Sequence, residues 1–424
     1  MEIRKFENIQ ETLYTDVLPN GLTINVVTKP VWLKCFALFA TGYGGADRRF
    51  NLGGQWVDTP AGVAHFLEHK MFDTPDGDNA LAVLSANGAQ PNAFTSNSMT
   101  AYYFESTQGF YDNLRTLLSF VSVPYFTPES VEKEQGIIGQ EIRMIEDNPG
   151  FVVYLNLMKS LYARNPIRDS VAGSIESIAQ ITDKTLYDCH RIFYNPSNMV
   201  LCVAGDVDPE RISAMAAEIL PKEPGEVPQR DYGEKEGPLP VKTRTEVNME
   251  VSAPQFIFGS KVFQAEKGAP LLRQKLTVNL ALRCLMGRSS PFYARLYAQG
   301  LLNNDFGYDL DYSGGYGTIM AGGESSDPEK VISELSKEVS AVADKGLDEA
   351  LFSRIKKAAY GSRLRSLGSF GVLCQNLAEG KFAGYCDLDA FHVLEEITVS
   401  EVRDFIANNL AQDKLAMSVV HPLH

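Results

Sequence analysis

The sequence predicts an α+β protein made of two homologous domains, each an antiparallel-rich sheet packed by helices. Its 424 residues exceed what one hydrophobic core usually holds, and two domains of about 200 residues are the default expectation. Residues 221–240 contain five prolines among Glu, Lys and Gly, without helical or strand periodicity. Similar helix and strand signals recur on both sides of that segment. We therefore expect two domains joined by a linker.

The repeat consists of matched residues 216 positions apart. Each copy has the signals of a capped amphipathic helix, a short loop and a buried strand, and short β-branched strands mixed with long helices indicate α+β domains. The matched pairs are Ile181 and Ile397, Thr182 and Thr398, Leu186 and Val402, Asp188 and Asp404, and Met199 and Leu415. We expect a first domain over residues 1–220, a linker over 221–243 and a homologous second domain over 244–424.

Composition narrows the class of protein. A hydrophobic content of 44% and a charged content of 22% are typical of a soluble globular protein. The net charge of −14 argues against nucleic acid as a partner, because binding phosphates needs clustered Lys and Arg. The charged N-terminus shows no secretory signal, and no apolar run reaches the roughly 18 residues that span a membrane. Six scattered cysteines without a C-x-x-C pair suggest a reducing compartment, so we expect a cytoplasmic protein with no membrane partner.

The first chemical signal is the pentapeptide His65-Phe66-Leu67-Glu68-His69, an H-x-x-E-H pattern. Thr59 as N-cap and Pro60 at the first helical position predict a helix that runs to Phe72. On a helix, positions i, i+3 and i+4 share one face. Two imidazoles can then bind zinc, and the carboxylate can take a proton from water. The alternative is a buried helix with two hydrogen-bonded histidines.

A third metal ligand has to come from elsewhere in the first half. The best candidate is a helix predicted to begin at Thr127-Pro128 and to end near Asp147. Its Glu134 and Glu141 lie seven residues apart and therefore share a face, two turns from each other. One of them can bind the metal while the other hydrogen-bonds a ligand or binds substrate. Spacing alone does not choose between them, nor does it exclude Glu132, Glu146, Asp73, Asp76 and Asp78.

The second half offers no comparable site. At the offset of 216 residues, His65, Glu68 and His69 fall on Ala281, Cys284 and Leu285, and no H-x-x-E-H occurs there. We therefore expect one zinc ion per chain, in the first domain. A thiol enzyme is a weaker alternative, because the adjacent residues Cys189 and His190 would point in different directions on a helix.

Several residue strings together carry a family resemblance. The chain resembles the insulinase/pitrilysin zinc metallopeptidases, and among them the branch of bacterial and mitochondrial processing peptidases. Besides Glu134 and Glu141, the matching strings are Leu18-Pro19-Asn20-Gly21-Leu22, Gly62-Val63-Ala64-His65-Phe66-Leu67-Glu68-His69, Asn92-Ala93-Phe94-Thr95, Tyr194-Asn195-Pro196-Ser197-Asn198-Met199 and Gly205-Asp206-Val207.

The resemblance implies a zinc endopeptidase that cleaves peptides or unfolded segments. It makes His65, His69 and Glu141 the zinc ligands, Glu68 the general base and Glu134 an acid that supports the ligands. It also places Asn92, Ala93 and Phe94 on an edge strand that binds substrate peptide by backbone pairing. In this family, two similar α+β domains form each unit, and two units close like a clamshell around a chamber.

The sequence departs from the family pattern in its second half. The family's second domain carries an arginine and a tyrosine that help to hold substrate, but Tyr297 and Asn304 stand near those places here. Arg295 and Tyr308 are the nearest substitutes. The departure suggests a homodimer, or a heterodimer in which a metal-free homologous subunit supplies these groups. A non-catalytic subunit of a two-chain complex is the alternative function.

Overall fold

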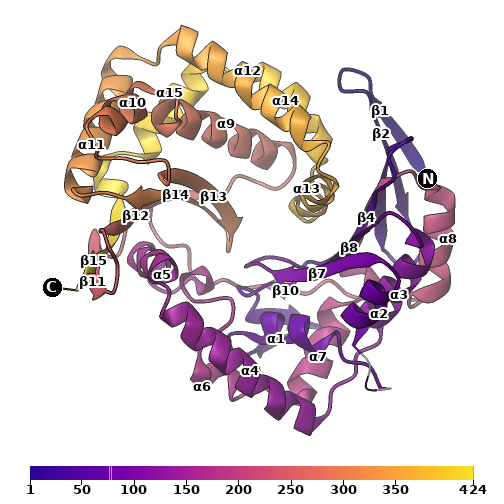
Figure 1. The fold of residues 1–424 in the computed structure, drawn as a ribbon. Coiled ribbons are helices and arrows are strands. Elements are labelled where there is room, and N and C mark those ends of the chain that lie inside the picture. Colours follow the sequence, from indigo (N-terminus) through magenta and orange to yellow (C-terminus); the bar gives the residue numbers. More distant parts are fainter. Residues whose placement is uncertain (76, 78, 424) are drawn as a thin grey trace. The chain divides into compact units, whose positions relative to one another are not determined.

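The computed structural model describes residues 1–75, 77 and 79–423, which form two compact units (Figure 1). The first unit comprises Met1–Ile142, Ser170–Tyr232 and Leu364–Leu388, and the second comprises Arg143–Asp169, Gly233–Arg363 and Asp389–His424. Asp76 and Asp78, two of the acids considered above, lie outside the described residues.

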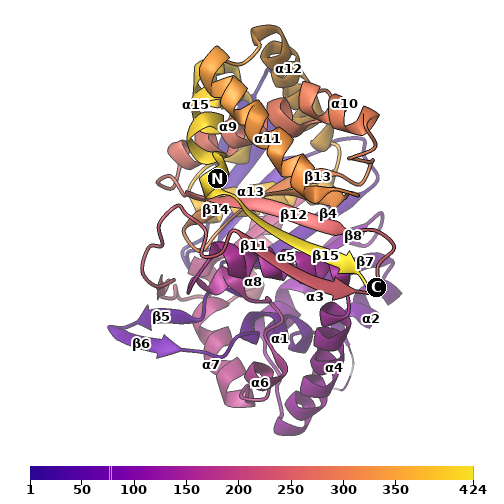
Figure 2. The same cartoon turned by 90° about the vertical axis from the view of Figure 1, so that its left-hand side faces the viewer.

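The first unit contains a seven-stranded sheet in the order β1-β2-β3-β9-β4-β8-β7, in which only β3 and β9 run parallel. Helix α13 packs on β4 and β9, whereas α1 packs against β7 and β8, and α3 packs against β4 and β8 (Figure 1). The short strands β5, β6 and β10 form a separate sheet, whose β5–β6 hairpin is visible in Figure 2. The strands are β1 (Glu2–Phe6), β2 (Glu11–Val17), β3 (Thr23–Thr28), β4 (Cys35–Thr41), β5 (Arg49–Leu52), β6 (Gln55–Asp58), β7 (Ala89–Thr95), β8 (Thr100–Ser106), β9 (Met199–Gly205) and β10 (Gln229–Arg230). The helices are α1 (Val63–Lys70), α2 (Ala80–Ala86), α3 (Phe110–Ser122), α4 (Pro128–Glu146), α6 (Ile175–Ile178), α7 (Asp183–Phe193), α8 (Pro209–Ile219) and α13 (Phe370–Ala383).

The second unit contains a five-stranded sheet in the order β11-β15-β12-β14-β13, with β11 and β15 parallel (Figure 2). Its strands are β11 (Arg244–Met249), β12 (Gln255–Phe263), β13 (Gly307–Ser313), β14 (Tyr316–Glu324) and β15 (Ala416–Pro422). Its helices are α5 (Pro149–Leu161), α9 (Ala269–Met286), α10 (Pro291–Ala298), α11 (Pro328–Lys345), α12 (Glu349–Ser366), α14 (Ala390–Glu396) and α15 (Val399–Asn409).

Five neighbouring strands of the first sheet, in the order β3-β9-β4-β8-β7, have the same topology as the five-stranded sheet, which confirms the predicted α+β class and duplication. Strand β9 lies between the parallel β3 and the antiparallel β4, and β15 lies likewise between β11 and β12. The helices before these strands, α7 and α15, are capped by Thr182 and Thr398, whose hydroxyls accept a backbone N–H of the first turn. These caps are the predicted matched pair, 216 residues apart.

Each unit takes one helix from the other half of the chain. Helix α5 follows α4, yet it buries Val153, Leu157 and Leu161 and packs on β11, β12 and β15. Helix α13 follows α12, yet it packs on β4 and β9. A sheet with an apolar face needs a cover, and here the cover comes from a helix distant in sequence. The compact units therefore differ from the contiguous ranges expected from the sequence.

An ion pair and hydrogen bonds hold the proline-rich linker to each of the two units. In the first unit, the buried carboxylate of Asp47 pairs with Arg230 at 3.2 Å and accepts the Tyr232 hydroxyl at 2.9 Å. In the second unit, Glu236 accepts the backbone N–H groups of residues 163–165. No helix in the described part of the chain is long and apolar enough to cross a bilayer.

Candidate metal centre

Helix α1 carries the H-x-x-E-H residues, and it begins later than predicted. Its first residue is Val63, and Gly62 occupies the N-cap with φ of 96°, a left-handed conformation that favours glycine. A Cβ atom at Gly62 would lie 2.7 Å from the carbonyl oxygen of Ala172. The predicted cap, Thr59, instead donates its hydroxyl to the Arg48 carbonyl at 3.1 Å. The helical face that carries the histidines is unaffected.

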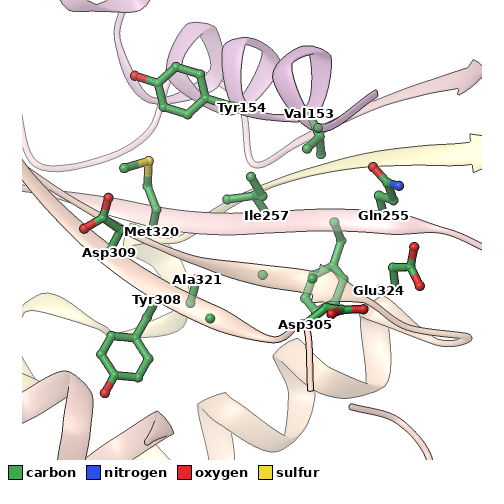
Figure 3. A pocket seen from close by; sticks show the side chains of 15 residues that line it. Val153, Tyr154, Gln255, Ile257, Asp305, Tyr308, Asp309, Met320, Ala321 and Glu324 are labelled. Atoms are coloured by element: carbon green, nitrogen blue, oxygen red, sulfur yellow. The ribbon is translucent and has the colours of Figure 1, made fainter. Parts of the chain in front are cut away.

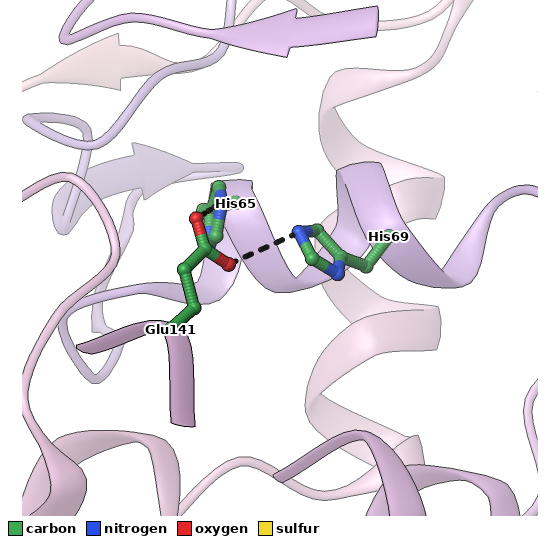
Figure 4. Close-up of side chains that lie close together, drawn as sticks. All are labelled: His65, His69 and Glu141. Carbon is green, nitrogen blue, oxygen red and sulfur yellow. Dashed lines mark ion pairs between the residues drawn. The ribbon is translucent and has the colours of Figure 1, made fainter. Parts of the chain in front are cut away.

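His65 and His69 point their Nε2 atoms at the same carboxylate, that of Glu141 on α4 (Figure 4). Each Nε2 lies 3.6 Å from a different oxygen of Glu141. One ligand atom from each residue can be chosen so that all three lie within 4.8 Å of one another, and no other such group of three occurs among the described residues.

These separations fit a metal ion better than direct hydrogen bonds. A direct N–H···O bond would bring the two atoms to about 2.9 Å. Tetrahedral zinc with bonds of about 2.0–2.2 Å separates its ligand atoms by about 3.3–3.6 Å. Two imidazoles and one carboxylate are also a donor set that zinc accepts in catalytic sites, where the fourth position stays open.

Glu134 holds His69 from the opposite side of the ring. Its Oε1 lies 3.0 Å from Nδ1 of His69, and in the neutral ring a proton on Nδ1 would leave the lone pair of Nε2 facing Glu141. Burial favours the neutral ring of His69 and by itself lowers its pKa. The hydrogen bond and charge of Glu134, together with the charges of Glu141 and Glu68, outweigh burial, so the pKa of His69 is raised. Burial, aided by the charge of His69, lowers the pKa of His65 to about 4. His65 is therefore neutral and able to bind a metal at pH 7.

Glu68 lies on the same helical face but does not join this carboxylate–imidazole group. Its Oε2 accepts the hydroxyl of Thr95 at 2.6 Å. Burial raises the pKa of Glu68, and the Thr95 bond partly opposes this effect. Thr95 belongs to the matching string Asn92-Ala93-Phe94-Thr95, but it is not among the predicted site residues. The available signal was strand alternation, which places Thr95 two residues after Ala93 on the same face of the strand.

The predicted edge strand is present as β7. It is the last strand of the sheet and pairs only with β8 among the described strands, so its other edge is open. Asn92, Ala93 and Phe94 lie in its second half, and α1 packs against β7. The strand that carries these residues therefore runs beside the helix that carries the two histidines.

The competing acids are not part of this group. Glu132 and Glu146 are exposed on α4, and Asp73 pairs with Lys70. In the second half, Ala281, Cys284 and Leu285 are buried side chains of α9.

The structure also argues against the thiol alternative. Burial raises the pKa of Cys189 to about 12, and His190 Nε2 donates to the Val121 carbonyl at 3.0 Å.

The second unit shows the contacts of Arg295, the nearest substitute for the family's arginine, and of Tyr297, which stands near that arginine's place. Arg295 lies 3.4 Å from Glu334 and 3.2 Å from Glu338, both on α11. Tyr297 stacks on Tyr293 with ring centroids 5.6 Å apart. The Arg295 guanidinium is thus neutralised within its own unit.

A cavity in the second unit contains none of the residues of the histidine group. It has a volume of about 580 Å³ and lies in the second unit, where α5 faces β12, β13 and β14 (Figure 3). Apolar side chains such as Val153, Ile257 and Met320 line it together with the carboxylates of Asp309 and Glu324. It is lined by no histidine, so we place the candidate chemistry at α1 and not at this cavity.

Comparisons with known proteins show the family to which the chain is similar. The family described as "Insulinase (Peptidase family M16)" matches residues 53–174, and "Peptidase M16 inactive domain" matches residues 180–359. The Bacillus subtilis protein named "Uncharacterized zinc protease YmfH" is 37% identical, covering 99% of this chain and 98% of the relative. The beta subunit of the Saccharomyces cerevisiae mitochondrial-processing peptidase is 25% identical, covering 94% and 89%. The crystal structure of an M16-like peptidase from Alicyclobacillus acidocaldarius superposes with a TM-score of 0.93 at 34% identity, covering 97% of this chain and 99% of that one.

Proposed function

Because the chain belongs to the insulinase family, peptidase family M16, we propose that it is a zinc endopeptidase whose metal is held by His65, His69 and Glu141. The observation that carries this proposal is the convergence of two imidazole Nε2 atoms on one carboxylate, each at 3.6 Å. We further propose that Glu134 keeps His69 in the tautomer that can bind the metal.

The proposed reaction is hydrolysis of a peptide bond. A bound zinc ion would supply the Lewis acidity that lowers the pKa of a water ligand to about 7 and polarises the scissile carbonyl. Glu68 takes a proton from the attacking water and then delivers it to the leaving amine. Its raised pKa suits both steps, since a base with a pKa nearer neutrality also returns its proton readily. Peptide substrate would pair with the open edge of β7 at Asn92, Ala93 and Phe94.

The test combines metal analysis with cleavage of a quenched-fluorescent peptide library, with and without chelator. We expect one zinc per chain and cleavage that chelator abolishes. Glu68→Gln should keep zinc and lose cleavage, and Glu141→Gln should lose both. Glu132→Gln, an exposed position on the same helix as Glu141, is the matched control and should retain both. Cleavage by Glu68→Gln at near the wild-type rate would show that the assigned base is wrong.

We also propose that the active enzyme is a dimer. The sequence lacks the family's arginine and tyrosine at Tyr297 and Asn304, and Arg295 is engaged by two glutamates. A relative such as the yeast processing peptidase is, by its name, one subunit of a larger enzyme. The partner is either a second copy or a metal-free homologous subunit. Zinc binding without cleavage of any library peptide by the isolated chain would favour the two-chain arrangement or the non-catalytic alternative.

The proposed location is the reducing cytoplasm. Five cysteines are buried, and burial raises the pKa of the Cys189, Cys202 and Cys284 thiols to about 12. Such thiols behave as small core side chains and resist oxidation. Labelling of the native protein with a thiol reagent under reducing conditions should leave these three cysteines unmodified.

A further inference from the structure

We infer that Thr95 is a positioning residue that holds the Glu68 carboxylate for proton transfer, acting through its hydroxyl hydrogen bond. The inference rests on the proposed peptidase function and adds a residue to that site. Thr95 is the last residue of β7, and its Oγ1 lies 2.6 Å from Glu68 Oε2.

The hydrogen-bond network determines where the Thr95 proton points. Thr95 Oγ1 also lies 3.3 Å from Thr100 Oγ1, its register partner on β8. Thr100 is fully buried and donates its own proton to the Tyr43 carbonyl at 2.9 Å. The proton of the Thr100 hydroxyl is therefore already donated to a carbonyl. Thr95 donates its single proton to the nearer, charged acceptor, Glu68.

The hydrogen bond from Thr95 holds one carboxylate oxygen of Glu68 in place. The other oxygen is left to accept the proton of water in the proposed reaction. A carboxylate has two oxygens, and a strong bond to Oε2 defines the rotation of the whole group. The hydroxyls of Tyr102 on β8 and of Tyr194 form a hydrogen bond of 2.9 Å. Burial raises the pKa of both phenols and keeps them neutral. Neither phenol therefore brings a charge of its own near Glu68, whose hydrogen-bond donor is the Thr95 hydroxyl.

Thr95 also connects two parts of the proposed site. Along β7, Asn92 and Phe94 face one side of the sheet, and Ala93 and Thr95 face the side of Tyr102 and Thr100. The strand proposed to bind peptide through its backbone thus ends in the side chain that holds the base. Loss of the hydroxyl should impair the chemical step while leaving the strand edge intact.

The experiment compares Thr95→Val, which removes the hydroxyl at nearly constant shape, with Thr95→Ser, which keeps it. Removing one hydrogen bond to a charged group should lower kcat by about 10- to 100-fold, with KM little changed. Thr95→Ser should recover most of kcat. The matched control is Thr23→Val, because the Thr23 hydroxyl is buried in the same sheet without a partner among the described residues, and its removal should leave kcat unchanged.

Two further readouts separate positioning from a structural role. Zinc content should stay at the wild-type level in Thr95→Val. The affinity of a fluorescent peptide for Glu68→Gln should not change when Thr95→Val is added, since Thr95 acts through the base. Thr95→Ala serves as a second variant without the hydroxyl.

The inference is overturned by wild-type kcat in both Thr95→Val and Thr95→Ala. It is likewise overturned if Thr95→Ser is as impaired as Thr95→Val, or if zinc is lost together with activity. A wild-type chain that cleaves peptides while Thr95→Val cleaves equally well refutes only this inference. A wild-type protein that cleaves no peptide even when it is loaded with zinc and assembled as a dimer refutes the proposed function and this inference with it.

Discussion

Replacing Glu134 with glutamine should weaken zinc binding without removing a ligand. In the structure, Glu134 Oε1 lies 3.0 Å from Nδ1 of His69, and a proton on Nδ1 would leave the Nε2 lone pair for the proposed metal. A hydrogen bond to a charged group contributes about 1.5–3 kcal/mol. At about 1.4 kcal/mol for each tenfold change, this corresponds to about 10- to 150-fold in affinity. Side-chain exposures of 27% for His69 and 14% for Glu134 favour the lower part of that range.

The assay is competition for zinc between the protein and a chromophoric chelator, at a fixed pH and ionic strength. Glu134→Gln keeps the shape of the side chain and removes its charge, so we expect about tenfold weaker binding and a folded protein. Glu132→Gln removes an exposed charge from the same helix and should change the affinity little. Equal affinities for the two variants would refute the claim that Glu134 acts through His69.

Three further predictions concern stability. His190 is buried and its pKa falls from 6.5 to about 4, so the unfolded state takes up a proton first as the pH drops. At about 1.36 kcal/mol per pKa unit, the free energy of unfolding should fall by about 3 kcal/mol between pH 6.5 and pH 4, and His190→Gln should flatten that slope in urea titrations. Gly62→Ala should destabilise the fold by about 1–3 kcal/mol, because φ is 96° and the Ala172 oxygen lies 2.7 Å from the new Cβ; an unchanged urea midpoint would contradict this. Leu157→Ala should cost about 2–5 kcal/mol by calorimetry, since Leu157 of α5 is fully buried, and a much smaller loss would question the packing of α5 on its sheet.

Local sequence determined the chemistry of α1 almost completely. The spacing of His65, Glu68 and His69 is a property of one helical turn, so any helix in that region presents all three on one face. The start of the helix was predicted three residues early, because Thr59 and Pro60 are good local signals. A left-handed Gly62 in contact with Ala172, more than 100 residues away in the chain, is a tertiary feature that no local signal shows.

The duplication was also predictable from the sequence, because Thr182 and Thr398 cap equivalent helices by local hydrogen bonds. The sequence did not predict that α5 packs in the second unit and α13 in the first. Both helices are apolar enough to cover a sheet, and periodicity does not say which sheet a helix covers.

The sequence by itself therefore determined the α+β duplication and the two histidines with their glutamate. Spacing left Glu141 and Glu134 equal and the family resemblance favoured Glu141, whereas the tertiary structure supplies the physical reason. The two share a face of α4, and the approach of α4 to α1 decides that one meets both Nε2 atoms while the other meets Nδ1 of His69. Tertiary structure alone also brought Thr95 to Glu68, because the contact joins a strand end to a helix across 27 residues of chain. Spacing fixes directions along one element, whereas contacts between elements depend on how their apolar faces pack.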